Sequence, residues 1–99
     1  MTSFEEKVYL AIRKIPKGKV ATYKAVARAL GRPKASRAVG NALNKNHRAP
    51  QVPCHRVVQG GGGIGGYASG ERQKNHLLKK EGVTIVKGKI DLEKFGWRF

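Results

Sequence analysis

The residues with the clearest capacity for chemistry are Cys54, the single cysteine of the chain, and His55, which follows it directly. A cysteine thiolate is a strong nucleophile, and a nearby base or positive charge favours its formation. Adjacent residues of an extended chain point to opposite sides, so a hydrogen-bonded Cys-His pair would need a turn or a bridging water. From these two residues alone, a reactive nucleophile and an inert buried thiol both stay open.

Other kinds of site fit the pattern less well. Cys54 and the three histidines, His47, His55 and His76, match no paired-ligand spacing, so we expect no metal. The stretch Gln59–Gly66 holds six glycines in eight positions but lacks the Walker sequence, so we interpret it as a loop rather than a nucleotide site. The chain is also too short for a two-lobed cysteine protease. A lone cysteine without an export signal indicates a free thiol in a reducing compartment.

Positive charge dominates the sequence. The 99 residues carry a formal net charge of +15, and between Val8 and Gly70 there are twelve Lys and Arg and no Asp or Glu. Such an excess repels itself unless a polyanion neutralises it, so we expect a nucleic acid partner, with RNA and DNA undivided on charge alone. The sequence has neither an apolar run of the roughly 20 residues that a membrane helix needs nor a secretory signal, which predicts no membrane partner and a cytoplasmic location.

The elements that must position Cys54 are predicted to form one domain over 1–99, mainly α with short β pieces. Capping signals and apolar spacing predict helices at 4–15, after Ser3; at 23–30, after Thr22; at about 34–45; and at 70–81, after Ser69 and before Gly82. The second and third helices, joined by a glycine-containing turn, predict a winged-helix-like or helix-turn-helix DNA-binding domain over about 22–45. Residues 57–58 should be extended, and the residues after 82 should close over the core.

The segment Pro53-Cys54-His55-Arg56-Val57 resembles the active-site signature of the O6-alkylguanine-DNA alkyltransferases, the methylated-DNA–protein-cysteine methyltransferases. The similarity covers most of the chain, in order and without apparent insertion. It extends through Gly18–Tyr23, Pro33–Gly40, Asn46, Gly66–Tyr67, Lys74 and Glu81–Gly82.

The resemblance implies a catalytic group of four residues. Cys54 would accept the alkyl group, and His55 would act as its base through a water. Glu81 would orient the imidazole and stabilise its cationic form. Asn46 would brace the turn before the active-site strand. No cofactor is implied, and because no internal group can cleave the resulting thioether, each molecule would act once.

The resemblance also implies a pocket for the flipped guanine, lined by Tyr23, by Val57 and, on the side of O6, by Tyr67, Ala68 and Lys74. Tyr23 would donate to the base, and the carbonyls of Cys54 and Val57 would accept its amino group. Ala68 stands where many relatives have serine. The contact expected there comes from the backbone N–H, so the resemblance implies weakened rather than abolished function.

For DNA binding, Arg37 would be the finger that fills the space the guanine leaves. Small residues on the third helix would let it approach the minor groove closely, and a lysine would add charge. These residues are Ala35, Ser36, Ala38, Gly40 and Lys34. The implied partner is double-stranded DNA containing O6-alkylguanine, bound by a monomer near the nucleoid, or in the nucleus of a eukaryote.

Two non-enzymatic functions remain as alternatives. Full-length relatives usually carry an N-terminal domain before the first helix, which this sequence lacks, as do the alkyltransferase-like proteins. Those proteins flag lesions for excision-repair proteins without repairing them and typically have tryptophan at the position of Cys54. The other alternative is a plain helix-turn-helix protein with an incidental cysteine, which predicts sequence-specific, dimeric binding.

Overall fold

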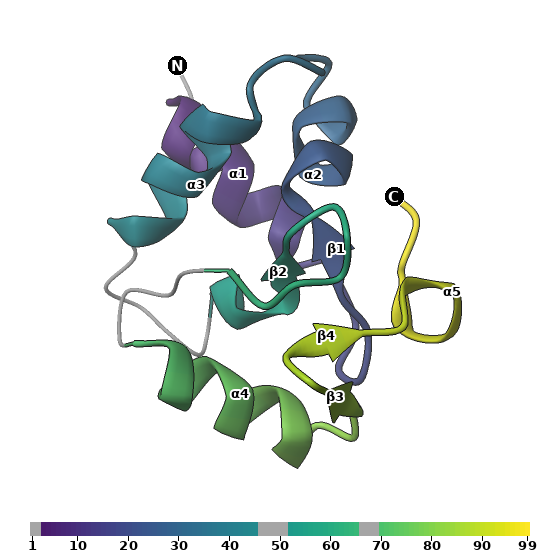
Figure 1. Ribbon diagram of the computed structural model, residues 1–99. Helices are drawn as coiled ribbons and strands as arrows, with labels where there is room; N and C mark the ends of the chain where they lie inside the picture. Colours follow the sequence, from purple (N-terminus) through teal and green to yellow (C-terminus); the bar gives the residue numbers. More distant parts are fainter. Residues whose placement is uncertain (1–2, 46–51, 66–69) are drawn as a thin grey trace.

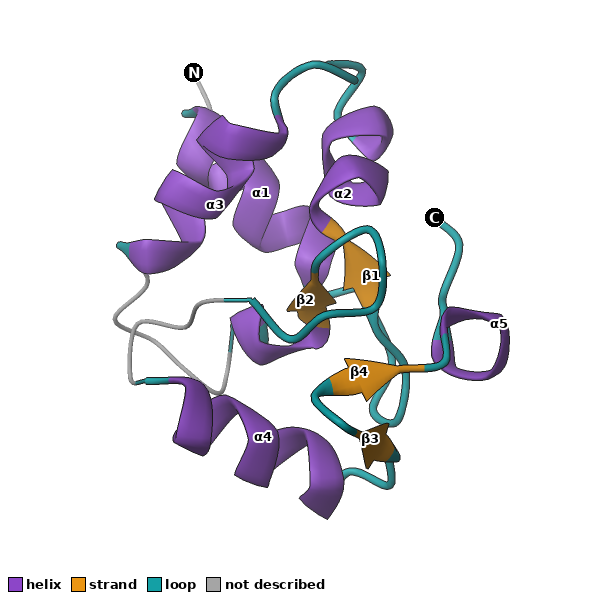
Figure 2. Ribbon diagram, viewed as in Figure 1, coloured by secondary structure: helices purple, strands orange, loops and turns teal. Residues whose placement is uncertain are grey.

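The computed structural model describes residues 3–45, 52–65 and 70–99. Helices make up most of the regular secondary structure and each strand is two residues long, so the predicted mainly helical fold with short β pieces is confirmed (Figures 1 and 2). Among these residues, no helix has both the length and the apolar character to cross a membrane.

Three helices form the N-terminal half: α1 (Phe4–Ile12), α2 (Tyr23–Ala29) and α3 (Ser36–Asn44). The predicted caps of the first two are confirmed. The Ser3 hydroxyl accepts from the N–H of Glu6 at 3.2 Å, and the Thr22 hydroxyl accepts from the N–H of Ala25 at 3.0 Å. Each cap satisfies a helix N–H that would otherwise lack a partner, and so fixes where its helix begins.

Two predicted helix boundaries are wrong. The third helix begins at Ser36 instead of about residue 34, because Arg32–Ala35 form a turn in which the N–H of Ala35 donates to the carbonyl of Arg32 at 2.9 Å. Proline, here the second residue of the turn, favours that position. The first helix ends at Ile12, since the N–H of Ile15 bonds to the carbonyl three residues back at 3.0 Å and tightens the chain before Pro16.

The strands bring distant parts of the chain together. β1 (Ala21–Thr22) pairs in parallel with β2 (Val57–Val58), which directly follows the short 3₁₀ helix η1 (Cys54–Arg56). The later elements are α4 (Glu71–Lys80), an antiparallel hairpin of β3 (Ile85–Val86) and β4 (Lys89–Ile90), and α5 (Leu92–Phe95). Gly70, with φ of 97°, is the N-cap of α4, so the predicted cap at Ser69 is wrong, and Gly82 ends that helix as predicted.

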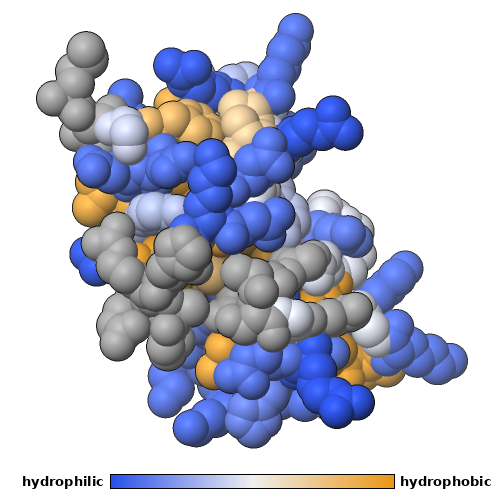
Figure 3. Space-filling model, turned by 90° about the vertical axis from the view of Figure 1, so that its left-hand side faces the viewer, coloured by the Kyte–Doolittle hydropathy of each residue, from blue (hydrophilic) through white to orange (hydrophobic). Residues whose placement is uncertain are grey.

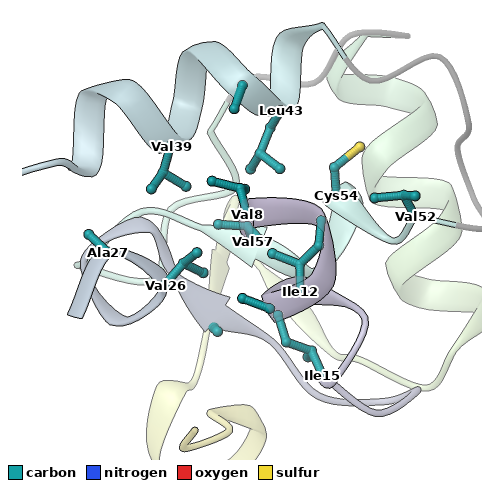
Figure 4. Packing of buried hydrophobic residues seen from close by; sticks show 13 residues of the cluster. Val8, Ile12, Ile15, Val26, Ala27, Val39, Leu43, Val52, Cys54 and Val57 are labelled. Carbon is teal, nitrogen blue, oxygen red and sulfur yellow. The ribbon is translucent and has the colours of Figure 1, made fainter. Parts of the chain in front are cut away.

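Two apolar clusters hold these elements. The first joins α1, α2 and α3 to the turn before β2, and it includes Cys54 (Figure 4). The second lies around the strands and α4. Ile12, Ile15 and Val57 are fully buried in the first cluster, and each such side chain contributes about 1.5–3 kcal/mol by leaving water.

The C-terminal segment is joined to the start of β1 through the backbone of Val20. The Val20 N–H donates to the carbonyl of Phe95 at 2.8 Å, and the Val20 carbonyl accepts from the N–H of Trp97 at 2.8 Å. The segment after α5 therefore has a fixed backbone although it has no helix or strand of its own.

Candidate active site

The Cys-His pair lies in a turn and not in an extended strand. The N–H of Cys54 donates to the Val52 carbonyl at 2.8 Å, and that of Arg56 donates to the Pro53 carbonyl at 3.0 Å, which closes η1. As a result Cys54 and His55 are both buried, at 3% and 0% exposed. Figure 4 shows the Cys54 sulfur pointing away from Ile12, at the border of the first apolar cluster.

Glu81 lies beside His55 at the C-terminal end of α4. The Nε2 atom of His55 is 3.1 Å from Oε1 of Glu81. A carboxylate in this position accepts the Nε2 proton, so the neutral imidazole keeps its lone pair on Nδ1. The structure thus brings together the imidazole and the carboxylate that the resemblance assigned to one catalytic group.

Arg56 is the residue whose place in this group the sequence reasoning missed. Its Nε and Nη2 atoms donate to the two oxygens of Glu81 at 2.9 and 2.7 Å, and its Nη1 donates to the carbonyl of Ile15 at 2.8 Å. Such a two-pronged pair fixes both the position and the plane of a carboxylate. The sequence did contain a signal for this role. A carboxylate assigned to a buried site requires a cationic partner, and Arg56, which directly follows His55, offers one.

The surroundings set the charges of this group. Burial lowers the pKa of His55, and this outweighs the hydrogen bond to Glu81, which raises it. Burial acts in the opposite direction on Glu81, but hydrogen bonds from Arg56 and His55 hold the pKa of that carboxyl below its ordinary value. Near neutral pH the group therefore consists of a neutral imidazole beside an ion pair between Glu81 and Arg56.

Removing the Arg56 side chain is expected to destabilise the protein and to change His55. Arg56→Met should lower the free energy of unfolding by about 3 kcal/mol, because a largely buried carboxylate loses its main partner. Arg56→Lys should lose about half as much, since an ammonium cannot bond both oxygens in one plane. With Glu81 left to His55, the imidazole should also bind a proton more readily. Urea unfolding and NMR titration of His55 measure both effects, and a wild-type titration in Arg56→Met would contradict the arrangement.

Tyr23 is the first residue of α2 and lies near Cys54. Burial raises the pKa of its hydroxyl, and the electrostatic interaction with Cys54 acts in the same direction, so the hydroxyl stays protonated and able to donate near neutral pH. The Nζ atom of Lys74 lies 5.8 Å from the centre of the Tyr23 ring. The structure therefore gathers the tyrosine, the cysteine and this lysine from three separate elements.

Lys74 is fully buried, so a solvated lysine on the surface of α4 is excluded. Its Nζ donates to the carbonyl of Val57 at 2.6 Å. The resemblance had assigned this carbonyl to the amino group of guanine, and the structure shows that Lys74 bonds to it. A carbonyl oxygen has two lone pairs and can accept a second donor.

Gly65 approaches the Tyr23 hydroxyl closely. A Cβ built on Gly65 would lie 3.1 Å from the Tyr23 hydroxyl oxygen and 3.3 Å from Cγ of Gln59, and its φ of 76° is unfavourable for other residues. The glycine-rich sequence predicted a loop here and gave no connection with Tyr23. Glycine is needed here for space as well as for backbone conformation.

Gly65→Ala is expected to displace the tyrosine and to slow any reaction that depends on it by roughly tenfold, since small misplacements in a site cost rate. Gly31→Ala is the matched control, because Gly31 has nearly the same φ, 74°, and no atom within 4 Å of the added Cβ. Both variants should lose about 1 kcal/mol of stability from the left-handed backbone. NMR of the Tyr23 ring together with lesion-repair rates measures the difference. An equal slowing in both variants would mean that backbone strain, and not the tyrosine, is responsible.

The candidate DNA-binding residues lie on α3 and the turn before it. Lys34, Arg37 and Ala38 are exposed, while the three other small residues are half-buried: Ala35, Ser36 and Gly40. On the face drawn in Figure 3, hydrophilic surface predominates over α3 and over α4.

Three further candidate residues, Asn46, Tyr67 and Ala68, lie outside the described residues. Within the described ranges, no three His, Cys, Asp or Glu side chains gather as a metal site.

These features, a paired helix unit and a buried cysteine beside a histidine and a glutamate, define a DNA-binding domain with a potential nucleophile. The chain belongs to the 6-O-methylguanine DNA methyltransferase family, a family of DNA repair methyltransferases, because residues 3–83 match the model of its DNA-binding domain. The methylated-DNA–protein-cysteine methyltransferase of Methanosarcina acetivorans is 51% identical over 81 residues, which cover 82% of this chain and 52% of the relative. The chain thus spans about half the length of this curated relative.

Solved structures agree with this assignment. The S. pombe protein Atl1, in complex with damaged DNA containing O6-carboxymethylguanine, superposes with a TM-score of 0.89 at 36% identity, over 100% of both chains. Mycobacterium tuberculosis OGT, in complex with DNA, superposes with a TM-score of 0.78 at 41% identity, over 82% of this chain and 50% of that one. The chain is therefore similar both to methyltransferases and to an alkyltransferase-like protein.

Proposed function

We propose that this chain repairs DNA directly by transferring the alkyl group of O6-alkylguanine to Cys54 in a single irreversible turnover. The observation that most supports the proposal is the arrangement of Cys54 and His55 in one turn, with Glu81 3.1 Å from the imidazole and Arg56 bonded to that carboxylate. This arrangement supports the proposal because a potential base, with its orienting groups, directly follows the single thiol of the chain in sequence.

In the proposed reaction, His55 takes the proton of the Cys54 thiol through a water. The sulfur then attacks the alkyl carbon, so that an S–C bond forms while the C–O6 bond breaks. The electron pair of the broken bond stays on the guanine, and donation by Tyr23 stabilises this charge until the proton held on His55 neutralises it. No cofactor takes part. Because the Cys54 side chain is 3% exposed, the surroundings of the sulfur must open when the base enters.

The proposed DNA-binding element is α3, which would enter the minor groove. The chain would bind as a monomer. The exposed Arg37 would enter the base stack, and the small residues around it would permit close approach to the groove. The net charge of +15 supplies affinity that is independent of sequence, which suits a search for lesions on the nucleoid or in a nucleus.

Intact-protein mass spectrometry tests the proposal. After incubation with a duplex containing one O6-methylguanine, the protein should gain one methyl group in place of one proton, and peptide mapping should place it on Cys54. A duplex with unmodified guanine is the control and should leave the mass unchanged.

A second candidate function, that of a lesion-binding protein which flags O6-alkylguanine for excision-repair proteins, is supported by the similarity to Atl1 over the full length of both chains. The cysteine at position 54, where the alkyltransferase-like proteins typically have tryptophan, favours transfer. The mass measurement separates the two candidates, because tight lesion binding with an unchanged mass would support flagging.

A further inference from the structure

Apart from the site around Cys54 and the surface of α3, the structure has an apolar surface, here called the tail patch, that consists of Leu10, Leu30, Trp97 and Phe99. Two hollows adjoin it, and Trp97 and Phe99 line both of them. One, of about 480 Å³, lies between α1, the end of α2 and the C-terminal segment, and the other, of about 490 Å³, lies between α2 and the same segment. The C-terminal segment, which supplies both aromatic residues, follows the part of the chain that the family model matches, residues 3–83.

The tail patch exposes apolar side chains on a fixed backbone. Leu10 is 55% exposed and Phe99 is 43% exposed. The rings of Trp97 and Phe99 meet edge to face, with their centres 4.8 Å apart, and the Trp97 backbone is bonded to Val20. A contiguous apolar patch with a charged rim is characteristic of a surface that binds another molecule, whereas single exposed apolar residues are not.

The rim of the tail patch is positive. Among the described residues that line the two hollows there is no acid, and the charged ones are all cations: Lys7, Lys14, Arg28 and Arg98. A partner that fits must therefore combine apolar groups, to fill the hollows, with negative charges around them. An amphipathic helix with carboxylates has both, and such helices bind to grooves of this kind.

Two other occupants fit less well. In Figure 1 the C-terminal segment lies on the opposite side of α2 from α3, and a DNA duplex offers phosphates but no apolar side chains to fill the hollows. A second copy of the chain would bring another +15 charge against an already positive rim.

We infer that the tail patch binds an acidic amphipathic segment of another protein, whose apolar side chains enter the hollow between Leu10 and Phe99 and whose carboxylates meet Lys7, Lys14 and Arg28. This interaction uses no residue of α3 and makes no contact with Cys54. It therefore holds for a methyltransferase and for a flagging protein alike, and would join the lesion-bound chain to a further component.

The single tryptophan of the chain makes the inference directly testable, because Trp97 lies in the patch. The probe is a synthetic helical peptide of about 16 residues with leucine at helical spacing and glutamate elsewhere. Titration into the full chain at low salt should shift the Trp97 emission to shorter wavelength as water is excluded. A peptide with lysine in place of glutamate should give no shift.

Matched variants locate the binding. Leu10→Ser should weaken peptide binding about tenfold, whereas Val86→Ser, which removes a similarly exposed apolar side chain from β3, should leave the affinity unchanged. Lys14→Glu should also weaken the affinity for the acidic peptide about tenfold, whereas Lys79→Glu on α4 should leave that affinity unchanged. Each variant is compared with the parent by urea unfolding, so that loss of binding is not confused with loss of fold.

Four outcomes would overturn the inference. One is an emission unchanged by the acidic peptide, and another is an equal response to the lysine peptide. Displacement of the bound peptide by lesion-free duplex would instead assign the patch to DNA. Self-association that Leu10→Ser abolishes would assign it to a second copy of the chain.

Discussion

Cys54→Ser is expected to abolish alkyl transfer, lowering the rate by at least about 10³-fold, while the affinity for duplex DNA stays within about twofold. A serine hydroxyl is a far weaker acid and nucleophile than a thiol, so the same base cannot activate it to a comparable degree. DNA affinity should survive because the candidate binding residues are on α3 and not on η1. The measurements are protein mass after incubation with an O6-methylguanine duplex, and fluorescence anisotropy with a lesion-free duplex.

The burial of Cys54 requires a control for the fold. Its side chain is 3% exposed and belongs to the first apolar cluster, so a buried hydroxyl should cost about 1 kcal/mol of stability. Cys54→Ala, which introduces no polar atom, should also lose transfer. If both variants lost DNA affinity along with transfer, Cys54 would have a structural role and the proposed reaction would fail.

His55→Gln is expected to slow transfer by about 10²–10³-fold, the usual contribution of a positioned base. The glutamine amide can still donate to Glu81, so the arrangement with Arg56 should persist, but it offers no basic nitrogen to the thiol proton. Single-turnover kinetics with a methylated duplex measure the effect. Transfer at the wild-type rate would show that the thiol is activated without this imidazole.

The pH profile gives a second, independent measure of His55. Burial lowers its pKa below the ordinary value of about 6.5, so the neutral, basic form persists into mildly acidic solution. The wild-type rate should fall as the pH decreases through this lowered pKa, and His55→Gln should lack that limb of the profile.

The free energy of unfolding should also decrease as the pH falls, as the transfer rate does. As the pH falls below 6.5 the unfolded chain takes up a proton that the folded chain does not, so the free energy of unfolding decreases until folded His55 is also protonated. A titration midpoint of His55 above 6.5 would mean that the hydrogen bond and charge of Glu81 outweigh the effect of burial.

Features with local causes could be predicted from the sequence. The caps at Ser3 and Thr22 and the end of α4 at Gly82 each depend on a side chain or a backbone preference within a few residues. The charge excess and the Cys-His pair are likewise visible in one stretch of sequence. This local information was sufficient for the mainly helical fold.

Features that depend on distant partners could not be predicted from the pattern of residues. Apolar spacing places Lys74 on the polar side of a helix, yet it is fully buried, and the Val57 carbonyl, which is 17 positions away, accepts a hydrogen bond from its ammonium group. In the same way the sequence gives no distance between Arg56 and Ile15, which their hydrogen bond joins across 41 positions. The resemblance assigned Glu81 to His55, and the two lie 3.1 Å apart, but it did not give the arginine that holds the carboxylate.

The backbone hydrogen bonds of Val20 connect the C-terminal segment to the turn that carries Cys54. The Val20 backbone bonds to Phe95 and Trp97, and the next residue, Ala21, is paired with Val57, directly after η1. A continuous backbone ladder thus runs from the last residues of the chain to the thiol-bearing turn, and its members should open as one cooperative unit. Amide hydrogens of Trp97 and Val58 should then exchange with solvent at similar rates, so that a molecule docked on the tail would slow motion around the sulfur without touching it.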